Sequence, residues 1–308
     1  MDSLYNTRPV QPAQPMQPYV RQDFEDEVMG VNTNELVNLL KYKQNLILQG
    51  APGVGKTYTA KRLCWLIMGC KDNSRITQVQ FHSSYTYEDF IKGLKPTDSG
   101  GYKMESGPFY DICVRASRDR QRPYFIIIDE INRGNISAIL GEAFSMIEKS
   151  HRDEPITLKY NKERFAVPRN LYIIGTMNTA DRGLTVLDYA LRRRFSFYTV
   201  LPAFDCEQFK NKMSSNFNKY LMRVLKQIRL LNKEISEDEL LGPGFMIGHS
   251  YFLGGTMINQ DVLNNIVEYE IIPLLREYWY DDIDGKADKW IEALRSAMTD
   301  GVGKQNDF

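Results

Sequence analysis

Residues 45–57 read NLILQGAPGVGKT, a short apolar run that leads directly into a glycine-rich loop. The loop matches the pattern GxxxxGK[ST], which binds phosphate when a buried strand precedes it and a helix follows it. Here residues 45–49 supply the strand and residues 57–68 supply the helix. The glycines let the backbone turn tightly and direct its N–H groups at phosphate oxygens, and the helix adds the positive end of its dipole. The stretch therefore predicts a nucleoside triphosphate site.

Two side chains of the loop have distinct expected roles. Lys56 can reach the β- and γ-phosphates as a mobile cation, and the Thr57 hydroxyl can bind a magnesium ion. The residues expected to contact the nucleotide are Gly50, Ala51, Pro52, Gly53, Val54, Gly55, Lys56, Thr57 and Tyr58. Glycine-rich turns also occur without nucleotide, but the complete pattern with both flanks favours binding. The loop alone does not distinguish one triphosphate from another.

The composition of the chain argues against several classes of protein. Its 308 residues carry 39 basic and 39 acidic side chains, so no dedicated basic DNA-binding domain is expected. Four cysteines without a CxxC pair, together with three histidines, argue against a zinc site. The sequence contains no signal-peptide pattern and no apolar run of transmembrane length. We therefore expect a cytoplasmic location and no membrane contact.

Apolar runs of strand length alternate with helical stretches up to about residue 200. This alternation predicts a three-layer α/β sandwich with a mostly parallel sheet. The expected strands are 45–49, 76–81, 124–129, 171–176 and 194–200. Two insertions interrupt the pattern: 94–107 is expected to form a hairpin or loop, and 155–168 is expected to form a hairpin. Both are candidates for contact with DNA or a partner. Solvated hairpin tips are the simpler alternative.

The chain divides into three expected parts. Residues 1–31 begin with prolines among glutamines and are expected to be a flexible stub, because prolines at this density disfavour helix and central strand. Residues 32–203 form the large α/β nucleotide-binding part. Residues 204–308 contain long stretches of helical periodicity, such as 220–235 and 261–280, and no clear strands. This last part is expected to be a smaller all-helical domain.

Two acids, Asp129 and Glu130, follow the apolar run 124–128 directly. The carboxyl ends of parallel strands meet at one edge of a sheet, which is where ligands bind. Asp129 is expected to hold magnesium through its water shell, and Glu130 to orient and polarise the attacking water. Strand ends often carry solvated acids, but a phosphate-binding loop about 70 residues upstream favours the functional interpretation.

Two later segments of the sequence contain further candidate site residues. Asn178 closes the run YIIGTMN, and its amide can reach the γ-phosphate or the lytic water if its strand lies between the two earlier motifs. A turn asparagine is the alternative. Arg193 and Arg194 belong to the run ALRRRF at 190–195. An arginine presented from a neighbouring subunit would stabilise charge on the transferring phosphoryl group, whereas a solvated basic corner is the simpler interpretation.

These motifs together resemble an AAA+ nucleotidase over residues 32–299. Five segments are similar to McrB-type proteins, the motor subunits of modification-dependent McrBC restriction systems, and MNTADR at 177–182 is the most specific part of them. The five segments are FHSSYTYEDFIKG (81–93), IIIDEINRGN (126–135), IIGTMNTADRG (173–183), LDYALRRRFSF (187–197) and GFMIGHSYF (244–252).

The resemblance implies an AAA+ sandwich followed by a helical lid, with GTP rather than ATP as the nucleotide, Mg²⁺ as the metal and a hexameric ring as the assembly. It implies that residues 50–57 are the Walker A loop, that Asp129 and Glu130 are the Walker B acids and that Asn178 is the first sensor. Asp181 and Arg182 complete the family signature, where an McrC-type endonuclease partner acts on hydrolysis. Arg193 and Arg194 match the trans-acting arginine positions, and the choice between them stays open.

Two departures from the family pattern matter for function. McrB-type proteins usually carry an N-terminal domain that recognises methylated DNA, and only a Pro/Gln-rich stub precedes the AAA+ region here. The second-sensor region reads IGHSYF, so His249 is a candidate to approach the nucleotide, although a hydrogen-bonded packing histidine is equally consistent with the sequence.

Three functions fit the motifs. The first is a GTP-hydrolysing ring motor that contacts DNA through its assembly, drives an McrC-type endonuclease and has no nuclease site of its own. The second is an ATP-driven MoxR-like remodelling chaperone that acts on protein. The third is a nucleotide-gated scaffold with little turnover, against which Glu130 and the arginines argue.

Overall fold

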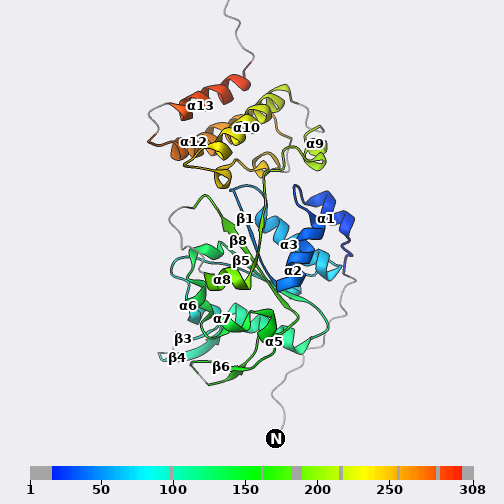
Figure 1. The fold of residues 1–308 in the computed structure, drawn as a ribbon, viewed down its shortest axis with the longest axis vertical. Helices are drawn as coiled ribbons and strands as arrows, with labels where there is room; N and C mark the ends of the chain where they lie inside the picture. The colour runs from blue at the N-terminus through cyan, green and yellow to red at the C-terminus, as the bar shows by residue number, and fades with distance from the viewer. Residues whose placement is uncertain are drawn as a thin grey trace, which may run out of the picture.

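The computed structural model describes residues 16–97, 100–160, 162–181, 189–214, 218–254, 257–281 and 285–299. A five-stranded parallel sheet with the order β2-β5-β8-β1-β9 organises the first part of the chain (Figure 1). The strands are β1 (Asn45–Gly50), β2 (Ile76–Gln80), β5 (Tyr124–Asp129), β8 (Leu171–Asn178) and β9 (Ser196–Thr199). The predicted sheet is confirmed. The last strand is shorter than expected because its predicted first residue, Arg194, ends a helix.

Alternation along the strands separates two apolar cores on the two faces of this sheet. On β1, Leu46 and Leu48 pack in one core with the helices α2 and α3, and Ile47 packs in the other core with α5. Both faces are therefore covered, and the carboxyl edge of the sheet remains for ligands. The elements around the sheet are α2 (Thr33–Lys43), α3 (Lys56–Met68), η1 (Asn73–Arg75), α4 (Tyr87–Phe90), α5 (Pro108–Arg118), η2 (Ile131–Arg133), α6 (Ile136–Leu140), α7 (Ala143–Met146), η3 (Lys149–His151) and α8 (Tyr189–Arg194).

The segment before residue 32 corrects the prediction of a flexible stub. Residues 16–31 belong to the fold, and their helix α1 (Arg21–Glu27) packs against α3. Phe24 is 0% exposed and Tyr19 is 1% exposed. The prolines end at position 18, and the apolar residues that follow at near-helical spacing find a hydrophobic face. The prediction for residues 1–15 lies outside the described residues.

Both insertions contain antiparallel hairpins, as predicted. The first pairs β3 (Lys92–Pro96) with β4 (Tyr102–Ser106), and the second pairs β6 (Ile156–Thr157) with β7 (Arg164–Phe165). Figure 1 places both at the opposite end of the sheet part from the C-terminal helices.

The C-terminal part is helical and has a core of its own, above the sheet in Figure 1. Ala203 and Phe204 already pack in this helical core, which is consistent with the division at residues 203–204 that we keep as a prediction. No helix within the described ranges is long and apolar enough to cross a membrane. The elements are α9 (Glu207–Ser214), α10 (Lys219–Glu237), η4 (Pro243–Phe245), η5 (His249–Phe252), α11 (Gln260–Asn265), the π-helical η6 (Ile266–Ile271), α12 (Ile272–Tyr278) and α13 (Lys286–Ala297).

Candidate functional site

The glycine-rich loop joins β1 to α3 and contacts the helical part of the chain. Gly53 has a φ of +73°, and a Cβ there would lie 2.7 Å from the ring of Tyr251. The carbonyl of Gly53 accepts a hydrogen bond from the Ser250 backbone N–H at 2.9 Å. Gly55 also has a positive φ and is the N-cap residue of α3. The loop is therefore held in a conformation that L side chains rarely adopt, with η5 directly against it.

Lys56 lies inside the loop and is only 8% exposed. Its Nζ donates to the carbonyls of Gly50 and Ala51 at 3.0 and 2.8 Å, and to Oδ1 of Asn178 at 2.5 Å. Burial lowers the pKa of the ammonium to about 8, and the charge of Glu130 opposes part of that shift. A buried ammonium held by neutral oxygens is well placed to bind phosphate oxygens, which would supply the charge that these partners lack.

The structure brings Thr57 and Asp129 together from different elements. The Thr57 hydroxyl donates to Oδ1 of Asp129 at 2.7 Å. Thr176 donates to the same oxygen at 2.9 Å, and Gln78 donates to the other at 2.6 Å, so the carboxylate is fixed from three sides. A hydroxyl beside an anchored carboxylate is the hard-oxygen pair that Mg²⁺ prefers, and phosphate and water oxygens complete such a shell. The residues therefore fit the predicted metal.

Glu130 stands next to this pair with a left-handed backbone, φ +52°. Its Oε1 accepts from Nδ2 of Asn178 at 2.6 Å, and its Oε2 lies 3.4 Å from Nε of Arg133. Burial raises the pKa of Glu130 above its ordinary value, although Arg133 lowers it in part. A half-desolvated carboxylate of raised basicity is suited to polarise a water molecule.

Asn178 connects the two halves of the site. Its strand β8 lies between β1 and β5, which is the neighbourhood that its predicted role required. The amide oxygen accepts from Lys56, and the amide nitrogen donates to Glu130. Asp181 follows three residues later and binds NH2 of Arg133 at 3.0 Å, so Arg133 bridges Glu130 and Asp181. Arg182 lies outside the described residues.

The two candidate arginines end α8 and differ in exposure. The side chain of Arg193 is 78% exposed, and its NH2 lies 3.6 Å from Glu148. The side chain of Arg194 is 17% exposed, lies 4.0 Å from Glu148 and sets its guanidinium 4.3 Å from the centre of the Phe144 ring. Both side chains make their contacts away from the phosphate loop of their own chain.

His249 is buried beside the junction of the two parts of the chain. Its Nδ1 accepts from the backbone N–H of Ala203 at 3.1 Å, and the rings of Phe204 and Phe209 lie about 6 Å away. Burial lowers the pKa of His249 to about 4, so the ring is neutral at pH 7. These contacts agree with the interpretation of His249 as a hydrogen-bonded packing residue. The same side chain also lines a cavity beside Gly55.

Comparison with known proteins identifies the family. A model for an AAA domain of the dynein-related subfamily matches residues 45–195, and a model for the McrB alpha-helical lid domain matches residues 223–287. The chain is 31% identical over 274 residues to the type II restriction enzyme BsuMI component YdiS of Bacillus subtilis, covering 73% of this chain and 77% of that protein. It is 46% identical over 274 residues to the type IV methyl-directed restriction enzyme EcoKMcrB subunit of Escherichia coli, covering 84% of this chain.

The chain belongs to the McrB-type family of AAA+ proteins. It spans 59% of the length of the E. coli relative. The MNTADR segment identified the family from the sequence, and the C-terminal helices are the McrB-type lid.

In this McrB-type chain, a cavity of about 250 Å³ extends from the phosphate loop to the lid. The sequence predicts that Tyr58 and His249 lie in this region, but it does not predict the contribution of Glu27, Val28 and Met29 from the N-terminal segment. Their signal in the sequence was the apolar spacing that follows Pro18. The cavity is lined by Glu27, Val28, Met29, Val54, Gly55, Tyr58, Thr59, Lys212, His249, Ser250 and Leu253.

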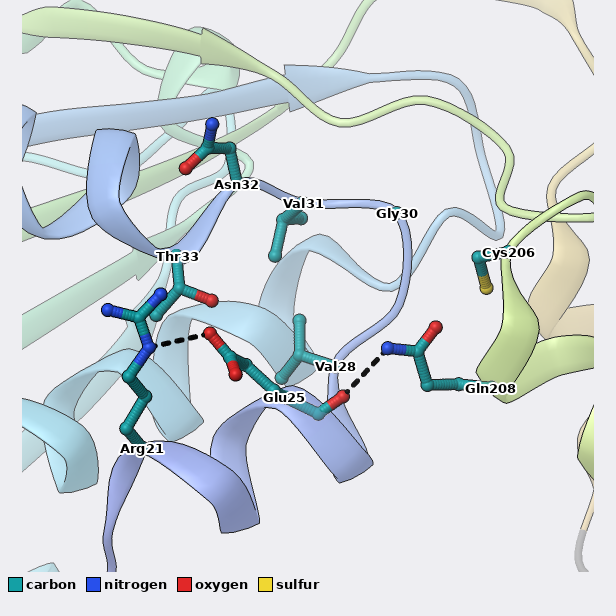
Figure 2. A pocket seen from close by; sticks show the side chains of 9 residues that line it. All are labelled: Arg21, Glu25, Val28, Gly30, Val31, Asn32, Thr33, Cys206 and Gln208. Atoms are coloured by element: carbon teal, nitrogen blue, oxygen red, sulfur yellow. Dashed lines mark hydrogen bonds and ion pairs between the residues drawn. The ribbon is translucent and has the colours of Figure 1, made fainter.

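A second hollow, of about 580 Å³, lies between the N-terminal segment and the lid helix α9 (Figure 2). Figure 2 shows the hydrogen bond from Nε2 of Gln208 to the carbonyl of Glu25, 3.2 Å long, which joins the lid to α1. Arg21 pairs with Glu25 at 2.7 Å in its wall. No residue of the phosphate loop lines this hollow, whereas Val54 and Gly55 of that loop line the smaller cavity.

No group of three or more His, Cys, Asp or Glu within the described part of the chain is arranged to hold a metal ion. The magnesium site considered above needs only Thr57 and Asp129, because phosphate and water oxygens supply its other ligands.

Proposed function

We propose that this chain is the GTP-hydrolysing subunit of an McrB-type ring that moves DNA for an McrC-type endonuclease. The observation that supports this proposal most strongly is a continuous chain of hydrogen bonds from Lys56 through Asn178 to Glu130. The hydrogen-bonded pair of Thr57 and Asp129 lies beside it. Phosphate-binding, metal-binding and water-polarising groups thus meet at one edge of the sheet, which is the arrangement that triphosphate hydrolysis needs.

The nucleotide would bind with its phosphates on the loop and its nucleoside in the 250 Å³ cavity. Lys56 would exchange its backbone carbonyl partners for β- and γ-phosphate oxygens. A bound Mg²⁺, held by Thr57 and Asp129, would neutralise charge on those oxygens. Because the walls of the cavity come from the N-terminal segment, the loop and the lid, nucleotide binding would draw these three parts together.

Glu130 and Asn178 would orient the attacking water. Glu130 accepts from the Asn178 amide through Oε1, and Oε2 remains for a water proton once Arg133 moves away. Asp181 competes for Arg133 at 3.0 Å, so a contact on the signature segment 177–182 would change the position of Arg133. We place the action of the McrC-type partner on this segment for that reason, with Asp181 and Arg182 as its members.

Arg193 is the better candidate for the arginine that acts on the neighbouring subunit, and Arg194 for its support. The side chain of Arg193 is 78% exposed, whereas Arg194 is 17% exposed and lies over Phe144. An exposed arginine at the end of a helix can enter the site of another subunit, where it would stabilise transition-state charge. This proposal requires a closed ring, and we propose a hexamer from the family resemblance.

Rates of GTP and ATP hydrolysis, measured with and without an McrC-type protein, test the proposed function. We expect GTP hydrolysis that the partner accelerates, and weak or no ATP hydrolysis. The control is the exposed Glu154→Gln, which should behave as the unaltered chain does. A clear preference for ATP without any stimulation by the partner would overturn the proposal in favour of a MoxR-like remodelling chaperone.

A further inference from the structure

Lys43, the last residue of α2, contacts the end of the arginine-bearing helix α8. Its Nζ lies 2.8 Å from the carbonyl oxygen of Arg193, 2.9 Å from that of Phe195 and 3.4 Å from that of Arg192. Two residues along the chain, Nδ2 of Asn45 donates to the carbonyl of Arg194 at 3.0 Å. One side chain from the end of α2 and one from the start of β1 therefore bind the carbonyls of residues 192–195.

These contacts matter because α8 is short. The last four carbonyls of a helix have no partner within it, and α8 spans only Tyr189–Arg194. A helix of this length gains little from its own hydrogen bonds. A lysine at its C-terminal end satisfies the open carbonyls and neutralises the negative end of the dipole. The backbone that carries Arg193 is consequently fixed from outside the helix.

Asn45 and Lys43, the two residues that bind the end of α8, differ in how firmly the surrounding structure holds them. Asn45 is 0% exposed, and its Oδ1 accepts from NH2 of Arg152 at 2.8 Å. Arg152 is itself 0% exposed and donates to three backbone carbonyls, those of Ile147, Pro168 and Leu171. Asn45 is thus part of a buried network of the core. Lys43 is half-buried and lies at the surface end of the same arrangement.

We propose that Lys43 is a positioning residue for the trans-acting arginine, and that it sets the direction in which Arg193 leaves the subunit. This inference rests on the proposed function. Within the described part of the chain, the Arg193 side chain pairs with Glu148 at a long 3.6 Å, so the backbone under it determines where its guanidinium points. The last residue of α2, just before the strand that leads to one subunit's phosphate loop, thereby controls hydrolysis in the next subunit.

A matched control is available in the same region. Lys149 donates to the carbonyls of Lys41 and Tyr42 at 3.0 and 3.1 Å, which is the same kind of contact on the end of α2. Lys149→Met removes an ammonium from a helix end without touching α8. A general loss of helix capping would affect both variants equally, whereas a positioning role would affect only Lys43.

The first measurement is the rate of hydrolysis of the triphosphate that the unaltered chain uses. For Lys43→Met we expect kcat to fall by about tenfold with KM within about twofold, because a small displacement of a catalytic group lowers the rate while nucleotide binding is unchanged. Lys43→Arg, which keeps the cation, should recover most of kcat, and Lys149→Met should retain it. Equal losses in Lys43→Met and Lys149→Met, or no recovery in Lys43→Arg, would overturn the proposal.

Mixed rings test the direction of the effect. A Lys43→Met subunit keeps its own hydrolytic residues, and a Glu130→Gln subunit keeps its Lys43 and Arg193. Their mixture should exceed the activity of either variant alone, because the second supplies a correctly placed arginine to the first. Arg193→Ala mixed with Glu130→Gln is the reference. If that reference pair complements and the Lys43→Met pair does not, the Lys43 proposal is wrong. If the reference pair fails, the trans-acting role of Arg193 is wrong.

Discussion

Phe24→Ala tests whether the N-terminal segment is part of the nucleotide site. Phe24 is 0% exposed and packs in the core shared by α1 and α3, while the same segment carries Glu27, Val28 and Met29 into the cavity beside the loop. Truncation of a buried phenylalanine costs about 3–5 kcal/mol where the site cannot collapse. The seven-residue α1 cannot absorb that cost by itself, because a helix so short depends on tertiary packing. We therefore expect the segment to detach before the sheet unfolds.

The expected consequence is weaker nucleotide binding. If detachment takes up even about 1.4 kcal/mol of the binding free energy, the dissociation constant rises about tenfold. Titration with a fluorescent GTP analogue measures this, and hydrogen exchange reports whether the amides of residues 19–29 lose protection. Val20→Ala is the control within the same segment, because Val20 is 56% exposed. Wild-type affinity with fully protected amides in Phe24→Ala would refute the reasoning, and so would an equal loss in Val20→Ala.

Three further predictions concern the site itself. Glu130→Gln should keep nucleotide binding and assembly but reduce turnover by about 100-fold or more, because the amide cannot take a proton from water; rapid hydrolysis by this variant would remove the assigned role. Asp129→Asn should raise the Mg²⁺ concentration for half-maximal turnover by about tenfold or more, since a neutral ligand replaces the carboxylate fixed beside Thr57, and an unchanged Mg²⁺ titration would contradict this. His249 should make stability rise with pH between about 4 and 6.5: its pKa is lowered to about 4, so the unfolded chain binds the additional proton in this window. Replacement by Asn should flatten this part of the urea-unfolding profile, and an unchanged slope would argue against a buried neutral ring.

The sheet and the centre of the site could be predicted because their signals are local. Apolar runs of strand length ended in Asp129 and Asn178, and parallel strands bring such ends to one edge whatever the details of the loops. The strand order then placed Asn178 between the loop and the acids. Periodicity therefore specified which side chains meet, although it could not specify that one asparagine binds both Lys56 and Glu130.

The N-terminal wall of the cavity beside the phosphate loop could not be predicted for a different reason. Prolines dominate the composition up to Pro18, and composition averages over the residues that follow them. Tyr19 and Phe24 gain their burial from α3, whose exposed apolar face is known only after folding. A segment that is too short to fold alone carries little intrinsic signal, since its order depends on the surface that receives it.

The choice between Arg193 and Arg194 shows the same limit at the level of two adjacent residues. Both have the same side chain, and neighbours on a helix point about 100° apart, so the sequence assigns them equal chemistry. Phe144, more than forty residues earlier in the chain, lies under the guanidinium of Arg194, whereas the side chain of Arg193 is 78% exposed, and Glu148 lies near both. Lys43 adds a third distant determinant by binding the carbonyls of Arg193 and Phe195, on either side of Arg194. Arg193→Lys would keep the positive charge but lose the planar guanidinium with its paired N–H donors. We therefore expect this variant to lose most of its stimulation of hydrolysis in the neighbouring subunit, whereas Arg194→Lys should retain more of it. The opposite order in a hydrolysis assay of the two variants would mean that subunit contact exposes Arg194 and buries Arg193.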